Sequence, residues 1–183
     1  MNIYDTKLKF LYNLAIVDLG DYKLPVAFNN STGNKTKKKK HNLHISFNVA
    51  DGQKPRIIEK IPERYFDTFG KAVFNPKTNR FTTSLRFTGE IIEASIVDED
   101  ATDYYTGFSQ FGMHLTIKAK KITFPVSYTI LLHVKEDGKI VGRSIDAETD
   151  VADDYFELPK VGDILSGVAE VNGFLINEKG EKL

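Results

Sequence analysis

The feature of this sequence that most constrains its fold is a strict alternation of apolar and polar residues in several separate stretches. In residues 43–49 every odd position is apolar and every even position is polar. Residues 81–87 and 111–117 repeat the pattern, with a threonine at position 83 as the one polar odd residue. Because successive side chains of a β-strand point to opposite faces, this alternation predicts half-buried strands.

The first thirty residues also show strand periodicity. The even-numbered residues from 8 to 16 are all apolar or aromatic, which predicts a single strand face made of Leu8, Phe10, Tyr12, Leu14 and Ile16. Gly20 and Asp21 then predict a turn, and residues 22–28 predict a returning strand. Pro25 has no backbone N–H, which favours an edge position for that strand.

Turn and bend signals separate the remaining predicted strands. Residues 75–79 and 136–139 have the composition of tight turns between two strands. Gly89 interrupts a long strand pattern, which is typical of a bulge or a sharp bend. Residues 62–70 instead predict a short helix, with Pro62 in its first turn and Gly70 at its end.

These elements predict an all-β fold, a barrel or sandwich of about eight to ten strands with one or two short helices. We expect one β-rich domain over residues 1–183. Residues 29–42 hold no large apolar residue and a run of lysines, which predicts a mobile loop. Residues 178–183 predict a frayed tail.

Several classes of protein are disfavoured by what the sequence lacks. It has no cysteine, which excludes disulfides, cysteine-ligated zinc and a thiol nucleophile. No nucleophile elbow or phosphate-binding glycine loop is found, so we expect no enzyme, no catalytic residue and no cofactor. The acidic residues 146–157 match the spacing of a calcium loop, but Val151 replaces its required glycine, and we expect no metal. The first twenty residues are too polar for a signal peptide, which predicts a cytoplasmic protein.

Charge is distributed unevenly along the chain. The whole chain has a formal net charge of +0, with 25 basic and 25 acidic residues. The first half, residues 1–92, is basic and residues 93–183 are acidic. This asymmetry indicates either polyanion binding or an acidic interaction surface.

Cationic and aromatic residues together suggest a nucleic-acid interface. Grooves that bind single strands combine cations for phosphates with aromatic rings for bases. The candidate interface residues are Lys7, Lys9, Lys37, Lys38, Lys39, Lys40, Arg80, Arg86, Tyr105, Phe108, Lys118 and Lys120. The alternative interpretation is that the rings pack in the core and the lysines are solvated surface.

Two glycine-containing stretches add a resemblance. Residues 158–173, with Val161-Gly162-Asp163-Ile164 followed by Gly167, resemble the sequence that introduces a strand in OB-fold barrels. Residues 88–96 have a similar glycine-then-hydrophobic form. The resemblance to OB-fold single-stranded nucleic-acid-binding proteins of phage or plasmid type implies an OB-like barrel. It also implies non-sequence-specific binding of single-stranded DNA, or of RNA, in DNA replication or recombination.

A second function remains open. The chain is alternatively a structural or inhibitory interaction protein, such as a virion component or an acidic mimic of nucleic acid. Its partner protein would then contact two predicted acidic loops, residues 98–103 and 146–157. The sequence predicts no membrane partner, and it leaves oligomerisation open.

Overall fold

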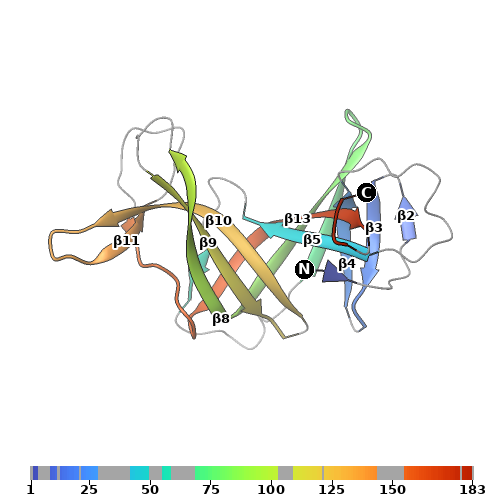
Figure 1. Ribbon diagram of the computed structural model, residues 1–183. Coiled ribbons are helices and arrows are strands. Elements are labelled where there is room, and N and C mark those ends of the chain that lie inside the picture. Colours follow the sequence, from blue (N-terminus) through green and yellow to red (C-terminus); the bar gives the residue numbers. More distant parts are fainter. Residues whose placement is uncertain are drawn as a thin grey trace.

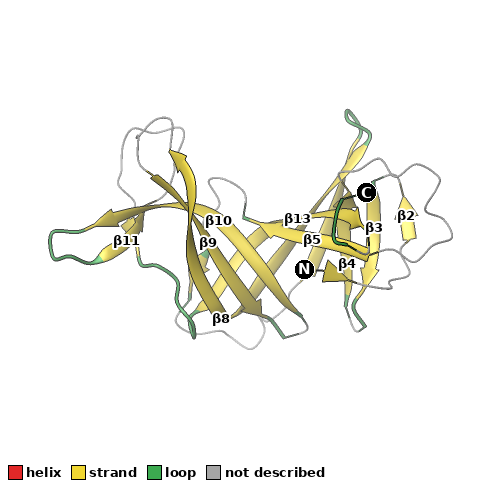
Figure 2. Ribbon diagram, viewed as in Figure 1, coloured by secondary structure: helices red, strands yellow, loops and turns green. Residues whose placement is uncertain are grey.

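A computed structural model of the chain describes residues 2–3, 9–11, 13–20, 22–28, 42–49, 55–58, 69–102, 109–120, 122–143, 155–177 and 179–182. Within these ranges all regular structure is strand, and no helix is present (Figure 2). The prediction of an all-β chain is therefore confirmed. The strands are β1 (Asn2–Ile3), β2 (Lys9–Leu11), β3 (Leu14–Asp18), β4 (Lys23–Phe28), β5 (Asn42–Asn48), β6 (Arg56–Ile57), β7 (Phe69–Asn75), β8 (Arg80–Thr102), β9 (Ser109–Lys118), β10 (Thr123–Val134), β11 (Ile140–Arg143), β12 (Tyr155–Phe156) and β13 (Ile164–Ile176).

The strands form one mixed sheet whose main path is β1-β5-β10-β9-β8-β13-β4-β3-β2 (Figure 1). Because β13 also pairs with β5, the five strands β5, β10, β9, β8 and β13 pair in a closed cycle. Four of these contacts are antiparallel ladders. The fifth, between β5 and β10, is parallel and has one register pair, Ser127 with Asn48. The Val49 N–H adds a hydrogen bond to the Ser127 carbonyl at 3.0 Å.

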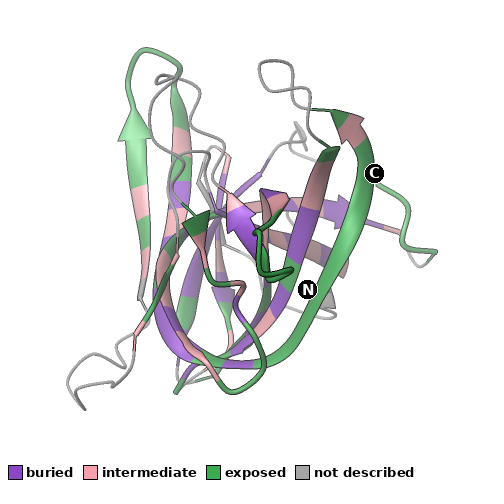
Figure 3. Cartoon of the chain, turned by 90° about the vertical axis from the view of Figure 1, so that its left-hand side faces the viewer, coloured by how far each residue is buried: buried purple, intermediate pink, exposed green. Residues whose placement is uncertain are grey.

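The interior of this cycle is the hydrophobic core, and the alternation in the sequence correctly predicts it. Residues 43, 45, 47 and 49 are all buried, as are 85, 87, 113, 115 and 117 (Figure 3). Three aromatic rings from β5, β8 and β10 meet inside the cycle. The ring of Phe124 lies 5.0 Å from that of Phe47 and 5.5 Å from that of Phe87, measured between centroids.

The strand β8 is long because it pairs with three other strands along its length. Its first part pairs with β7 on one edge and β13 on the other, and its later part pairs with β9. At Gly89 the backbone passes so close to β9 that an added Cβ would lie 2.7 Å from the Lys118 carbonyl oxygen. A register shift, typical of a β-bulge, follows between Ile91 and Glu93. The predicted bend is therefore present.

The first strand prediction is wrong in its extent. Residues 8–16 do not form one strand, because β2 and β3 are two antiparallel strands with Leu11 paired to Leu14. Asn13 makes this break favourable, since its side chain accepts from the Phe81 N–H at 2.6 Å and donates to the Phe81 carbonyl at 2.9 Å. In β3 the side chains of Leu14, Ala15 and Val17 are buried, whereas that of Ile16 is only partly buried, so in this strand the core-facing side chains are not those of the predicted face alone.

The predicted helix over residues 62–70 is wrong at its end. Phe69 and Gly70 are the first residues of β7, which is connected to its partner β8 by a turn at residues 76–79, within the predicted turn 75–79. Pairing along the whole of β7 outweighs the local signal for a helix end. The part of the prediction over residues 62–68 lies outside the described residues. Pro25 pairs with Ile16 of β3. On its other edge β4 pairs with β13 only at Ala27 and Phe28, so the missing N–H of Pro25 interrupts no ladder described between β4 and β13.

Three predicted loop or tail segments can be checked in part against the described residues. Asn42 is the first residue of β5, and the rest of the predicted loop 29–42 lies outside the described residues. Asp98–Thr102 is strand and not loop, because it pairs with β9 as part of β8. In the tail, Lys182 forms an isolated bridge with Ile176.

A buried hydroxyl connects the cycle to the β2-β3-β4 edge. The Thr83 hydroxyl accepts from the Ala27 N–H of β4 at 2.8 Å and donates to the Val171 carbonyl of β13. The Thr83 side chain is 5% exposed, so water does not readily replace these bonds.

We therefore expect Thr83→Val, which keeps the shape of the side chain, to lower the free energy of unfolding by about 2 kcal/mol. Urea denaturation measures this change. The matched control is Thr88→Val, since the Thr88 hydroxyl has one partner, the Ser166 hydroxyl at 3.0 Å. Equal losses in the two variants would contradict the bridging role of Thr83.

Candidate nucleic-acid interface

A groove of about 730 Å³ runs across the outer face of β5, β8, β9 and β10. Outward-pointing polar residues supply much of its lining, together with backbone and edges of the core residues beneath. The outward-pointing residues are His44, Ser46, Glu93, Ser95, His114, Thr116, Pro125 and Ser127.

The strand register arranges these residues in rows across the sheet. One row crosses all four strands and consists of Ser95, His114, Ser127 and Asn48. In this row the Ser127 hydroxyl donates to the Asn48 amide oxygen at 3.0 Å. Directly paired residues share a face, so the row presents hydroxyl, imidazole and amide groups to the same solvent-filled space.

The next row consists of Glu93, Thr116 and Pro125. Here the Thr116 hydroxyl donates to a Glu93 carboxylate oxygen at 2.7 Å. The carboxylate therefore has a fixed neighbour, and Pro125 supplies an apolar surface at the end of the row.

Gly112 makes room for two polar side chains beside the first row. An added Cβ would lie 2.8 Å from the His114 imidazole Nε2 and 2.9 Å from a Glu99 carboxylate oxygen. The other Glu99 oxygen accepts from the Thr129 hydroxyl at 3.4 Å. Alternation predicts that residue 112 faces outward, but only the register reveals that a glycine there leaves space for Glu99 and His114.

His44 closes the groove on the β5 side. Burial lowers the pKa of its imidazole, which favours the neutral form that both accepts and donates hydrogen bonds. Its ring lies 4.7 Å from the ring of Phe174, between centroids. The Lys182 ammonium lies 5.5 Å from the centroid of that same phenylalanine.

The groove is lined by polar groups and by apolar surface, and it is not cationic. Its lining includes the Glu93 carboxylate and, among the described residues, neither lysine nor arginine. The predicted cation nearest along the sheet is Lys118, which follows Thr116 by two positions on β9 and is paired with Glu90. The groove therefore suits hydrogen bonds to the uncharged edge of a ligand such as a base. Any phosphate groups of such a ligand would have to lie outside the groove.

The described candidate residues from the sequence fall into different places. Lys118 and Lys120 are exposed at the end of β9, and Arg86 is exposed on β8. Arg80 donates to the Phe28 carbonyl at 3.1 Å, so it also has a structural contact. Lys9 is in β2, at the far end of the sheet path. Seven of the candidates lie outside the described residues: Lys7, Lys37, Lys38, Lys39, Lys40, Tyr105 and Phe108.

Two further cations share the outer face with Arg86. Lys71 of β7 is paired with Ser84, two positions from Arg86, and Arg56 of β6 is paired with Ser166. Because Ser166 is paired with Thr88, alternation places Arg56, Lys71 and Arg86 on one face. We call Arg56, Lys71, Arg86 and Lys118 the basic face. Sequence reasoning missed Arg56 and Lys71 because neither stands in a strongly alternating stretch.

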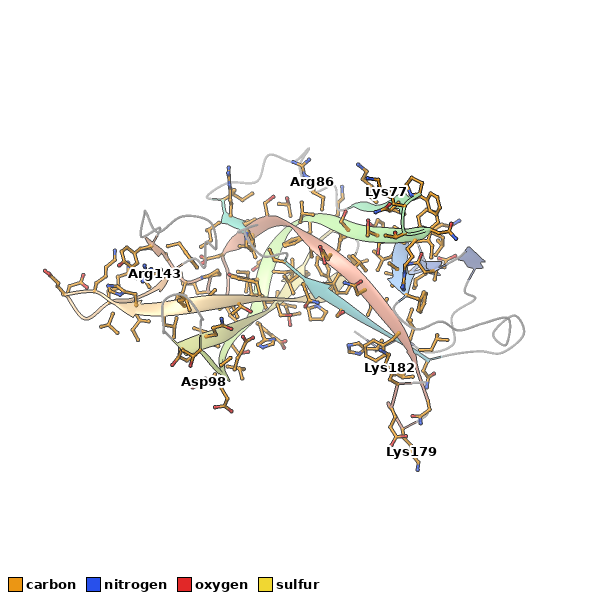
Figure 4. All side chains as sticks on the ribbon, turned by 90° about the horizontal axis from the view of Figure 1, so that it is seen from above. Lys77, Arg86, Asp98, Arg143, Lys179 and Lys182 are labelled. Atoms are coloured by element: carbon orange, nitrogen blue, oxygen red, sulfur yellow. The ribbon has the colours of Figure 1, made fainter. Side chains whose placement is uncertain are left out.

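The basic face and the acidic end of β8 lie on different sides of the molecule. Arg86 and Lys77 lie on one side of the ribbon, and Asp98 lies on the opposite side (Figure 4). Asp98, Glu99 and Asp100 are all exposed. The charge asymmetry in the sequence therefore has a counterpart in the described part of the structure.

Comparison of the chain with protein-family models, with curated proteins and with solved structures finds no match. Within the described ranges there is no helix long and apolar enough to cross a bilayer. Over the same ranges, the histidine and carboxylate side chains form no cluster suited to holding a metal ion.

Proposed function

We propose that this protein binds single-stranded nucleic acid, with bases in the polar groove and phosphates along the basic face. The observation that carries the proposal is the closed pairing cycle of five strands with a groove on its outer surface. An OB fold is a five-stranded, partly open barrel that binds oligonucleotides across one such face.

The strand order supports an OB-like barrel. In an OB barrel a three-stranded antiparallel meander meets one parallel strand, as β8, β9 and β10 meet β5 in this chain. Along this chain β5 comes before the meander instead of after it. An OB barrel would account for this order if its chain ends lay at another connection, as in a circular permutation.

The groove and the basic face form one continuous path. Starting from the Ser95 row, the outer face continues through Glu93 and Thr116 to Lys118, and from there along β8 to Arg86. Hydroxyl, amide and neutral imidazole groups suit the polar edges of bases, whereas exposed cations suit phosphates. The segment that joins β8 to β9 contains Tyr105 and Phe108, which are sequence candidates for base stacking.

A role in DNA replication or recombination, as the sequence resemblance implies, would follow from binding without sequence preference. Groove residues with both donor and acceptor capacity accept any base. The same residues would also accept RNA. Parallel titrations with DNA and RNA oligonucleotides of equal length separate these two substrates.

The test is a fluorescence-anisotropy titration of a labelled thymidine oligonucleotide at low and at moderate salt. We expect affinity to fall as salt rises, with a slope of about −0.7 in logarithmic units for each phosphate contact. We expect the double variant Arg86→Glu/Lys118→Glu to weaken binding at least about tenfold and to flatten the slope.

The matched control is the double variant Lys135→Glu/Lys179→Glu, which reverses two exposed lysines outside the basic face. We expect it to retain most of the affinity. A folded wild-type protein that fails to bind at low salt would refute the function. Equal weakening in the two double variants would refute the location.

A further inference from the structure

One edge of β8 is open beyond the point where β13 leaves it. On that edge β13 pairs with β8 only from Ser84 to Glu90, and the last backbone bonds there join Ile91 to Asp163 and Gly162. From residue 93 onward β9 occupies the other edge of β8. Within the described part of the chain, no strand pairs with the free edge of residues 93–102.

This open edge is accessible over the length of an ordinary strand. Register irregularities limit it on both sides, one between Ile91 and Glu93 and the other between Asp98 and Ala101. Residues 92–100 are all exposed, and Figure 3 shows this part of β8 as a long exposed ribbon. Ile96 and Val97, on opposite faces, are 40% and 49% exposed. Residues 93–98 are thus a strand-length template for another strand.

The charges along this edge select its partner. Glu93, Asp98, Glu99 and Asp100 lie in or next to the template, and it contains no basic residue. If a second copy paired antiparallel to it about Ile96, Glu93 of each copy would face Glu99 of the other. Shifting the centre to Asp98 would bring two aspartates face to face. Like charges directly opposite each other are destabilising, so the edge disfavours its own copy.

We propose that the free edge of β8, residues 93–98, docks an extended basic polypeptide by adding it to the sheet as a further strand. Main-chain hydrogen bonds to the free edge would hold the peptide, and the apolar side chains on one of its faces would cover either Ile96 or Val97, which lie on opposite faces of the strand. Lysine or arginine at alternate positions would pair with the exposed carboxylates. This edge adjoins the groove through Glu93 and Ser95 but lies apart from the basic face. The proposal rests on the free backbone edge and its carboxylates, and not on nucleic-acid binding.

Hydrogen exchange of the full chain, with and without a peptide of alternating lysine and valine, tests this proposal. In residues 93–98 we expect the peptide to slow exchange about tenfold or more at the alternate amides that face the free edge, because those N–H groups become paired. An otherwise identical peptide of alternating glutamate and valine is expected to leave them unchanged. Equal protection by both peptides, or by neither, would overturn the proposal.

A variant pair tests the role of charge while keeping local structure. Asp98→Asn/Asp100→Asn removes two charges but retains an acceptor for the residue 100 N–H, now bonded to Asp98 Oδ1 at 3.0 Å. Asparagine also tolerates the positive φ of 50° at Asp100. We expect affinity for the lysine–valine peptide to fall about fivefold.

Asp137→Asn is the control, since that carboxylate makes the same kind of backbone contact in the β10–β11 turn, to the Lys139 N–H at 2.9 Å. It should leave the peptide affinity unchanged. Sedimentation of the protein alone tests whether a second copy of the chain occupies the edge instead. A dimer with residues 93–98 already protected would assign the edge to a second copy and overturn the proposal.

Discussion

The variant Gly89→Ala is expected to lose about 3 kcal/mol of folding stability, enough to unfold a marginal domain at moderate temperature. The reason is that the new Cβ would lie 2.7 Å from the Lys118 carbonyl oxygen and 2.7 Å from Ile117 Cγ2. A backbone oxygen in a paired strand cannot move without breaking the ladder between β8 and β9. Urea or thermal denaturation followed by circular dichroism measures the loss.

Gly167→Ala is the control for this prediction. Gly167 lies on β13, in the same sheet, and an added Cβ there would be 3.2 Å from both Phe87 Cζ and Pro55 Cβ. These are side-chain atoms, which can shift by the few tenths of an ångström required, so we expect a loss below about 1 kcal/mol. A Gly89→Ala protein as stable as Gly167→Ala would show that the close approach of β8 and β9 is not real.

Truncation of Phe124 to alanine is expected to cost about 4 kcal/mol, because it empties the centre of the closed cycle. The Phe124 side chain is 1% exposed and contacts the rings of Phe47 and Phe87. These three residues come from β5, β8 and β10, so one truncation weakens contacts across the whole interior. Equilibrium denaturation in urea gives the change in the free energy of unfolding.

Phe74→Ala provides the comparison. The Phe74 ring also contacts a neighbouring ring, that of Phe81 at 5.0 Å between centroids, but the residue is 40% exposed. We expect a loss of about 1 kcal/mol, since little apolar area and no cavity are involved. Similar losses for the two phenylalanines would contradict the placement of Phe124 at the centre of the core.

The parts of the fold that could be predicted from the sequence are those determined by side-chain alternation. Strands β5, β9 and the first part of β8 bury the expected residues because each has one face on the core. The end of β2 was not predictable, since the turn depends on the contact between Asn13 and Phe81, far away in the chain. The strand β7 was missed because its pairing with β8 outweighs a local signal for a helix end.

The candidate site was less predictable, for a physical reason. Charged residues can be recognised individually in a sequence, and Arg86 and Lys118 were. A groove, by contrast, depends on which strands become neighbours. His114, Ser127 and Asn48 share a row only because β10 lies between β9 and β5. No local pattern around any of these three residues indicates the other two.

The link between β5 and β10 has a consequence for motion. The cycle of strands is held together there by a single register pair, so it has its lowest resistance to separation along that line, while its four longer ladders stay intact. If β5 and β10 separated along this line, His44 and Ser46 would move away from Pro125 and Ser127. The groove would then widen on its β5 side only. Amide exchange at Val49, whose N–H donates across that line to the Ser127 carbonyl, should report such opening directly.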